Sequence, residues 1–138
     1  MSANPTDLPA PADQDGLRAC IESLRDLYAD DVRWIAPRRG VERVGREAVI
    51  RNLLREAASM LEPRFTHLRR SQCGSQVFDE YAVRFILAGD GIEGVVLRQG
   101  DHVELERLRI LTLEAGLIVV ETCIETWSVL PGDHAGTS

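Results

Sequence analysis

Four charged residues interrupt two otherwise apolar rows near the end of the sequence. Arg107 and Arg109 lie in the segment HVELERLRILTLE, and Glu121 and Glu125 lie in LIVVETCIETW. Within each pair the spacing is even, so both members share one face of a strand. A carboxylate can accept and return a proton, whereas an arginine only holds charge and donates hydrogen bonds. The four residues therefore suggest acid/base chemistry by a glutamate beside a fixed positive charge.

The two segments are predicted to form one hairpin that turns at Glu114-Ala115-Gly116. A three-residue loop ending in glycine is a favoured connection, because glycine adopts the left-handed conformation without strain. A loop of this length places Arg109 opposite Glu121 and Arg107 opposite Cys123. Opposite charges across two strands stabilise the pair by roughly 0.2–1 kcal/mol.

In this arrangement Glu121 is the candidate proton-transfer group. Arg109 would hold the carboxylate ionised and oriented, and Arg107 would bind a carboxylate, enolate or phenolate oxygen of a ligand. Cys123 would line the same site, although a free cysteine more often fills a core. Alternation alone leaves a second interpretation open, in which the charged row is a solvated face with cross-strand ion pairs.

Three aromatic or titratable side chains elsewhere could border the site. Trp34 lies in a short predicted strand, and Tyr28 lies near the end of the first predicted helix. Both can contact a ligand, and both residue types are also common in cores. His67 lies on a predicted strand without an assignable partner, which favours a structural role over that of a general base.

Composition excludes several functions. The 138 residues suit one domain, and the net charge of −6 with 16 basic residues argues against nucleic acid or an anionic membrane as partner. No residue is lysine, which excludes a lysine Schiff base. Three separated cysteines and no clustered histidines predict a reducing, cytoplasmic setting and no metal or other cofactor. Neither a signal peptide nor a membrane span is expected.

Two amphipathic helices are predicted before a series of long strands. The first helix is expected from Asp15 to about Asp30-Asp31, and the second from Gly45 to about Leu61, where Pro63 prevents continuation. Strands are expected over residues 32–35, 41–44, 65–71, 76–87 and the final hairpin. This order indicates an α+β fold with helices on one face of a mainly antiparallel sheet. The predicted domain spans residues 15–130, between a disordered lead-in at 1–14 and a disordered tail at 131–138.

Three segments together resemble the NTF2-like superfamily, in particular its SnoaL-like and limonene-epoxide-hydrolase-like branches. They are LYADDV before the first strand, GREAV opening the second helix, and the last hairpin with Gly116 at its turn and Trp127 near its end. The resemblance covers about residues 17–129. It implies a cone, in which a curved sheet wraps around the helices and encloses a deep, mostly apolar pocket. The same cone hosts isomerases, hydrolases, cyclases, dehydratases and binding modules, so the fold does not fix the function.

The resemblance also allows known family sites to be compared position by position. The two catalytic aspartates of ketosteroid isomerases fall at Ala36 and Arg109, so that site is absent. Among the residues of limonene epoxide hydrolases, Arg107 matches the arginine, whereas the two aspartates fall at Arg109 and about Cys123. The acid/base residue on the last strand of SnoaL-type cyclases has its nearest counterpart in Glu121.

Two function classes follow from these comparisons. The resemblance implies a cofactor-independent cyclase, isomerase or hydrolase that acts on a small cyclic or polyketide-like molecule. The missing aspartates keep a second class open, a non-catalytic ligand-binding or dimerisation module. We expect catalytic roles for Glu121, Arg109 and Arg107, and ligand contacts for Trp34, Cys123 and Tyr28.

A homodimer through the outer face of the sheet is also expected. Four outward residues would form a patch too apolar to leave open, namely Leu108, Ile110, Val120 and Ile124. Members of the superfamily that the chain resembles often dimerise through this face.

Overall fold

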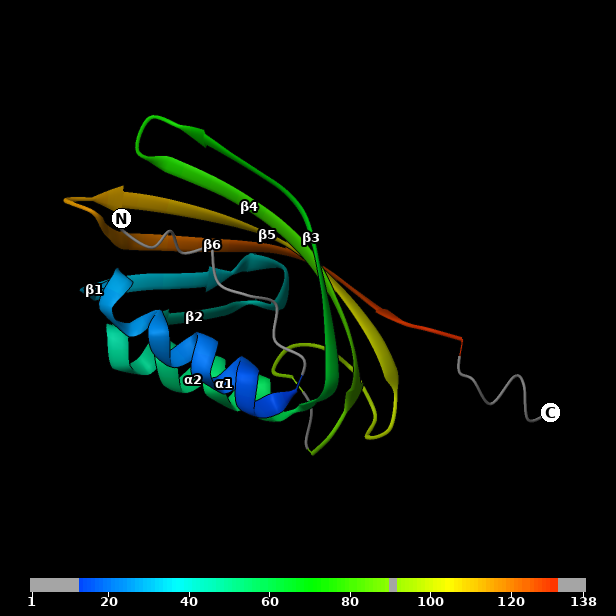
Figure 1. The fold of residues 1–138 in the computed structure, drawn as a ribbon. Coiled ribbons are helices and arrows are strands. Elements are labelled where there is room, and N and C mark those ends of the chain that lie inside the picture. The colour runs from blue at the N-terminus through cyan, green and yellow to red at the C-terminus, as the bar shows by residue number, and fades with distance from the viewer. Residues whose placement is uncertain (1–12, 90–91, 132–138) are drawn as a thin grey trace.

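The computed structural model describes residues 13–89 and 92–131. A six-stranded sheet bends around two α-helices, which lie together against its concave side (Figure 1). In chain order the elements are α1 (Gln14–Ser23), the 3-10 helix η1 (Arg25–Leu27), β1 (Tyr28–Ala36), the 3-10 helix η2 (Pro37–Arg39), β2 (Val41–Val44), α2 (Arg46–Ala58), β3 (Met60–Cys73), β4 (Gln76–Leu87), β5 (His102–Glu114) and β6 (Leu117–Val129).

The strand order in the sheet is β2-β1-β6-β5-β4-β3. Neighbouring strands are antiparallel except β1 and β6, which run parallel. The last strand therefore lies inside the sheet, between the first strand and its own hairpin partner. The predicted α+β class, with helices packed on one side of a mainly antiparallel curved sheet, is confirmed.

The first helix is shorter than predicted. It begins after Asp13, whose carboxylate accepts a hydrogen bond from the Gly16 backbone N–H at 2.7 Å, so the predicted cap at Asp15 is wrong. Strand β1 already begins at Tyr28, and Asp30-Asp31 therefore lie within a strand and not at a helix end. Tyr28 fits both the helical spacing of the preceding leucines and the alternation of buried residues in β1. Pairing with β6 decides in favour of the strand.

The second helix also ends earlier than predicted. Instead of continuing the helix to Leu61, the chain enters β3 at Met60, well before the predicted strand start at Phe65. Pro63 lies within β3, at an irregularity in the pairing with β4 where Glu62 has a φ of 50°. An edge strand tolerates proline at such a bulge, because no second neighbour requires the missing N–H. The apolar stripe of α2 packs on the core as predicted, through Val49, Ile50, Leu53 and Leu54.

The β5–β6 hairpin turns through two residues and not the predicted three. Ala115 and Gly116 both have a positive φ, 52° and 80° respectively, as in the two-residue turns that match strand twist. A β-bulge follows, because the register jumps from Ile118 to Val120 and leaves Val119 with no opposite residue in β5.

The turn and the bulge together change which residues face each other. Arg109 lies opposite Cys123, and Arg107 lies opposite Glu125. The predicted pairs Arg109–Glu121 and Arg107–Cys123 are therefore wrong by two positions. The shorter turn contributes one position of this shift and the bulge contributes the other. Because the sum is even, the odd-numbered residues of both strands beyond the bulge still share the concave face.

The convex face carries the four apolar residues expected at a dimer contact. All four are half-buried within the single chain: Leu108, Ile110, Val120 and Ile124. Among the described residues, no helix is both long and apolar enough to cross a membrane. The predicted lead-in and tail lie mostly outside the described residues.

Candidate functional site

All six predicted site residues are buried against the concave side of the sheet. Each is at most 8% exposed: Tyr28, Trp34, Arg107, Arg109, Glu121 and Cys123. The interpretation of the charged row as a solvated face is therefore wrong. The side chains do not form one group, however, because neighbouring positions of β5 direct Arg107 and Arg109 into two different ion-pair clusters.

The first cluster is centred on Glu121. Tyr28 donates a hydrogen bond from its hydroxyl to Glu121 Oε1 at 2.6 Å. Arg109 binds the same carboxylate with two nitrogens, Nε to Oε2 at 2.9 Å and Nη2 to Oε1 at 3.3 Å. The Cys123 thiol lies 3.6 Å from Oε2. We call these four residues, together with Asp79, the Glu121 cluster.

The electrostatics of this cluster fix its protonation at neutral pH. Burial alone would raise the pKa of Glu121, but the charge of Arg109 and the hydrogen bonds from Arg109 and Tyr28 bring that pKa below its usual range. Burial and the charge of Glu121 raise the pKa of the Tyr28 hydroxyl well above its usual value. The same two causes raise the pKa of the Cys123 thiol. Glu121 is thus an ionised carboxylate beside a protonated phenol, and Cys123 is a thiol and not a nucleophilic thiolate.

Asp79 extends the Glu121 cluster towards the edge of the sheet. Its Oδ2 lies 3.7 Å from Arg109 Nη1, and its Oδ1 lies 2.7 Å from Nε2 of His67. Asp79 is buried on β4, whereas His67 lies on the edge strand β3 and is exposed. Sequence analysis missed Asp79, although one signal was present: it interrupts the apolar row of β4 between Val77 and Tyr81.

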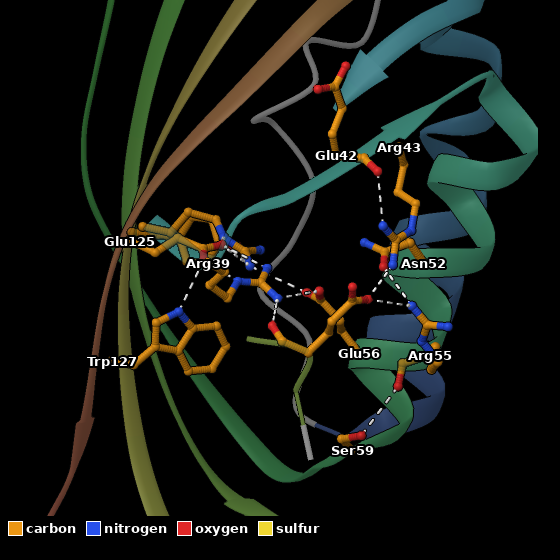
Figure 2. A network of polar contacts seen from close by, with 12 residues as sticks. Arg39, Glu42, Arg43, Asn52, Arg55, Glu56, Ser59, Glu125 and Trp127 are labelled. Atoms are coloured by element: carbon orange, nitrogen blue, oxygen red, sulfur yellow. Dashed lines mark hydrogen bonds and ion pairs between the residues drawn. The ribbon is translucent and has the colours of Figure 1, made fainter. Parts of the chain in front are cut away.

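The second cluster, here called the Arg39 cluster, joins Arg39, Glu56, Arg107 and Glu125. Figure 2 shows Arg39 between Glu56 and Glu125. Arg39 Nε lies 2.7 Å from Glu125 Oε1, and its Nη1 lies 3.1 Å from Glu56 Oε2. Arg107 Nη2 lies 2.6 Å from Glu125 Oε2 and 3.5 Å from Glu56 Oε1. Each arginine therefore contacts both glutamates. Burial alone would raise the pKa of Glu125, but the charge of Arg107 and the hydrogen bond from Arg39 lower it.

Aromatic rings enclose the Arg39 cluster. The Arg39 guanidinium carbon lies 5.6 Å from the centroid of Trp34 and 5.4 Å from that of Trp127, within the range of cation–π attraction. Trp127 also donates its indole N–H to Glu125 at 3.1 Å. Tyr81 accepts a hydrogen bond from Arg107 Nη1 at 2.9 Å. Trp34 differs from these, because its buried Nε1 has no hydrogen-bond partner among the described residues.

Arg39 and Glu56 are the residues of this cluster that sequence analysis missed. Arg39 ends the short helix η2, which lies between the strands predicted over residues 32–35 and 41–44. Its Nη1 also donates to the Glu93 backbone carbonyl at 3.0 Å, and a Cβ at Gly94 would come within 2.6 Å of the Arg39 carbonyl oxygen. Glu56 falls in the buried stripe of α2, three residues after Leu53, and this position in an apolar row could have identified it.

The two clusters differ in the chemistry that they can support. In the Glu121 cluster an ionised carboxylate contacts a group that carries a proton, which is the requirement for acid/base chemistry. In the Arg39 cluster both carboxylates contact guanidinium groups, and Glu125 also accepts the indole N–H of Trp127; neither kind of donor exchanges a proton at neutral pH. Within the described residues no group of three or more His, Cys, Asp or Glu side chains is arranged to hold a metal ion.

Comparison with known proteins finds one matching family and several solved structures with a similar fold. Residues 17–121 match the SnoaL-like domain family. A proposed SnoaL-like polyketide cyclase from Jannaschia has 16% identity and a TM-score of 0.66 over 80% of this chain and 73% of that one. A proposed ketosteroid isomerase from Kribbella flavida has 19% identity and a TM-score of 0.58 over 86% and 75%. An LEH-like epoxide hydrolase from M. tuberculosis has 13% identity and a TM-score of 0.58 over 82% and 76%.

Identities this low show the fold and not the activity. No curated protein matches the sequence. An NTF2-like protein of unknown function from Cytophaga hutchinsonii, with a TM-score of 0.60 and 15% identity over 82% of this chain and 91% of that one, confirms the NTF2-like cone. With most of its length matched by one family and with this sheet and helix arrangement, the chain belongs to the SnoaL-like domain family.

Proposed function

We propose that this chain is a cofactor-independent enzyme that moves a proton on a small cyclic or polyketide-like molecule, with Glu121 as the proton acceptor. The observation that carries the proposal is the buried contact of Glu121 with Tyr28 and Arg109, in which the carboxylate is ionised and the phenol is protonated. An ionised carboxylate can accept a proton directly, and Arg109 keeps it in that state.

The ligand oxygen needs stabilisation because the lowered pKa makes Glu121 a weak base. Glu121 takes a proton from a carbon next to a carbonyl, or from a water that opens a strained ring, and negative charge then develops on the ligand oxygen. Trp34 lies beside Glu121 in the β1–β6 register and supplies a buried N–H without a partner among the described residues. This donor supports a ligand oxygen near Glu121.

The similar solved structures agree with this class of ligand. Their names include a proposed polyketide cyclase, a proposed ketosteroid isomerase and an LEH-like epoxide hydrolase. Their identity to this chain is below 25%, so the reaction type is inferred from Glu121 and its neighbours.

A second candidate function is a non-catalytic ligand-binding module. The observation in its favour is that both oxygens of Glu121 already hold hydrogen bonds, Oε1 from Tyr28 and Arg109 and Oε2 from Arg109. A carboxylate whose two oxygens both accept hydrogen bonds within the protein also fits a purely structural role. In that case the cone binds a ligand without moving a proton.

Hydrogen–deuterium exchange at carbon distinguishes the two functions. Small cyclic ketones are incubated with the protein in D₂O, and NMR follows the loss of their α-proton signals. The wild-type protein is expected to exchange them faster than buffer alone, and Glu121→Gln is expected to return the rate to that of buffer. Circular dichroism confirms that the variant is folded.

Tryptophan fluorescence gives the separate measure of binding. The sequence has only two tryptophans, Trp34 and Trp127, and both contact Arg39, so the signal reports on this region alone. A ketone that changes the fluorescence of the wild-type protein without being exchanged supports the binding module. Full exchange by folded Glu121→Gln shows that Glu121 is not the proton acceptor.

A further inference from the structure

His67 is exposed on the concave side of the edge strand, next to a buried carboxylate. It lies opposite Tyr81 in the β3–β4 register, and directly opposed residues of antiparallel strands share a face. The His67 side chain is 53% exposed, whereas that of Asp79 is 4% exposed. The ring is therefore accessible, while the group that holds it is not.

The contact with Asp79 fixes the position of the imidazole. His67 Nε2 lies 2.7 Å from Asp79 Oδ1. A carboxylate oxygen accepts this hydrogen bond, so the ring proton of the contact is assigned to Nε2, and Nδ1 carries the free lone pair in that tautomer. Asp79 is in turn held by Arg109 at 3.7 Å, so its orientation depends on the buried ion pairs of the Glu121 cluster.

The surroundings of His67 offer a place for a flat ligand. Phe65 and Tyr81 lie on the same face, with ring centroids 5.5 Å apart and both rings half-buried. The Tyr81 hydroxyl is fixed by Arg107. In Figure 1 the turn of the β3–β4 hairpin projects away from the two helices.

We propose that His67, positioned by Asp79, is a second acid/base centre of this protein. Its ligand is a planar aromatic or conjugated molecule that stacks on Phe65 and Tyr81 and presents a proton to Nδ1. This centre is distinct from Glu121 and does not depend on Glu121 as the proton acceptor.

A suitable probe is 5-nitrobenzisoxazole, which is planar and loses one proton to a base. The base takes the proton from C3, the C–H electron pair forms the nitrile, and the N–O bond breaks to give 2-cyano-4-nitrophenolate. The proton ends on His67 Nδ1, and the coloured phenolate gives the rate. The reaction needs no oxidant, reductant or second substrate.

The wild-type protein is expected to accelerate this elimination above buffer. General-base catalysis typically contributes a factor of about 10²–10⁴, so His67→Gln is expected to lower the rate at least about tenfold. His102→Gln is the matched control, because His102 lies at the start of β5 and has no part in either cluster. It should leave the rate unchanged.

Two results would overturn the proposal. They are a wild-type rate equal to that of buffer and a folded His67→Gln protein with the wild-type rate. Failure of ketone exchange with an intact effect of His67→Gln would reject the role of Glu121 and leave this proposal standing.

The positioning role of Asp79 has its own spectroscopic test. Nitrogen-15 NMR of the imidazole distinguishes which ring nitrogen carries the proton. The wild-type protein should show the Nε2–H form of His67, and Asp79→Asn should mix the two forms and lower the elimination rate. A wild-type ring protonated on Nδ1 would contradict the assignment, even if Asp79→Asn also destabilised the fold.

Discussion

The Glu121 cluster and the Arg39 cluster occupy neighbouring positions of the same concave face, yet they contact different kinds of group. The Arg39 cluster combines two arginines with two glutamates, so its charges cancel, and it is enclosed by aromatic rings. The Glu121 cluster combines one arginine with two carboxylates, and its other contacts are a phenol, a thiol and an imidazole. Buried ion pairs are thus present in both, but only in the Glu121 cluster do a phenol, a thiol and an imidazole contact the carboxylates.

The comparison separates structural roles from chemical ones. Arg39 connects η2 with α2, with β6 and with the loop at Glu93, so its ion pairs hold the parts of the cone together. Removing one partner of a buried ion pair leaves the other charge uncompensated. The Arg39 cluster should therefore determine stability, while the Glu121 cluster should determine proton transfer.

The largest expected effect is on stability, from Arg39→Ala. This change leaves only Arg107 to compensate Glu56 and Glu125, which should cost about 3–5 kcal/mol of unfolding free energy. Urea unfolding measures the cost. The matched control is Arg33→Ala, which removes an ion pair with Glu42 whose side chains are 52% and 47% exposed, and it should cost about 0–1 kcal/mol. Equal losses for the two variants would contradict a structural role for the Arg39 cluster.

A smaller effect is expected from Tyr28→Phe. The variant loses a hydrogen bond to a charged group at little change in shape, which typically costs about 1.5–3 kcal/mol. Because that hydrogen bond helps to lower the pKa of Glu121, the pKa should rise in the variant. Carbon-13 NMR titration of the glutamate carboxyl groups measures this change. A Glu121 pKa that stays constant or falls would show that the contact is energetically unimportant.

Acid should weaken both clusters over the same range. The folded-state pKa of Glu121 and that of Glu125 lie below the ordinary value of 4.5. Their stabilising contribution is thus fully present above about pH 4.5 and is lost as the pH falls through the folded-state values. Urea unfolding at successive pH values from 7 to 3 should show a falling free energy below pH 4.5. A free energy that rises over this range would contradict the lowered pKa values.

A substitution on the convex face is expected to have the smallest effect on either cluster. We propose that Leu108, Ile110 and Ile124 take part in a homodimer, because an apolar sheet face favours contact with a second copy. Ile110→Arg should convert a dimer into a monomer in sedimentation experiments at micromolar concentration. Tryptophan fluorescence should stay unchanged, since both tryptophans lie on the concave side. A wild-type protein that sediments only as a monomer would reject the dimer.

Much of the concave row could be predicted from the sequence, because a register error of an even number of residues leaves each side chain on the same face of its strand. The turn at Ala115 and the bulge at Val119 each shifted the register by one residue, so the predicted opposite pairs were wrong. Glu121, Arg107 and Arg109 nevertheless stayed on one face. The ion pair of Arg109 with Glu121 therefore forms, but between diagonal and not opposite positions.

The partners from distant elements could not be predicted in the same way. Arg39 lies in a stretch that resembles an exposed turn, and only the packing of η2 against β6 buries it. His67 received no chemical role because its partner, Asp79, is on the next strand and is displaced from the directly opposite position. Contacts of this kind depend on how distant elements pack and pair in the folded protein, which the local sequence pattern does not determine.

The central claim is that the Glu121 cluster, and not the Arg39 cluster, transfers the proton. The most direct test compares Glu121→Gln with Glu125→Gln in the ketone exchange experiment, with each rate divided by the fraction of folded protein. Both substitutions remove one buried, arginine-bound carboxylate and keep its shape. The account predicts exchange at the buffer rate for Glu121→Gln and at the wild-type rate for Glu125→Gln. Equal rates in the two variants would contradict it.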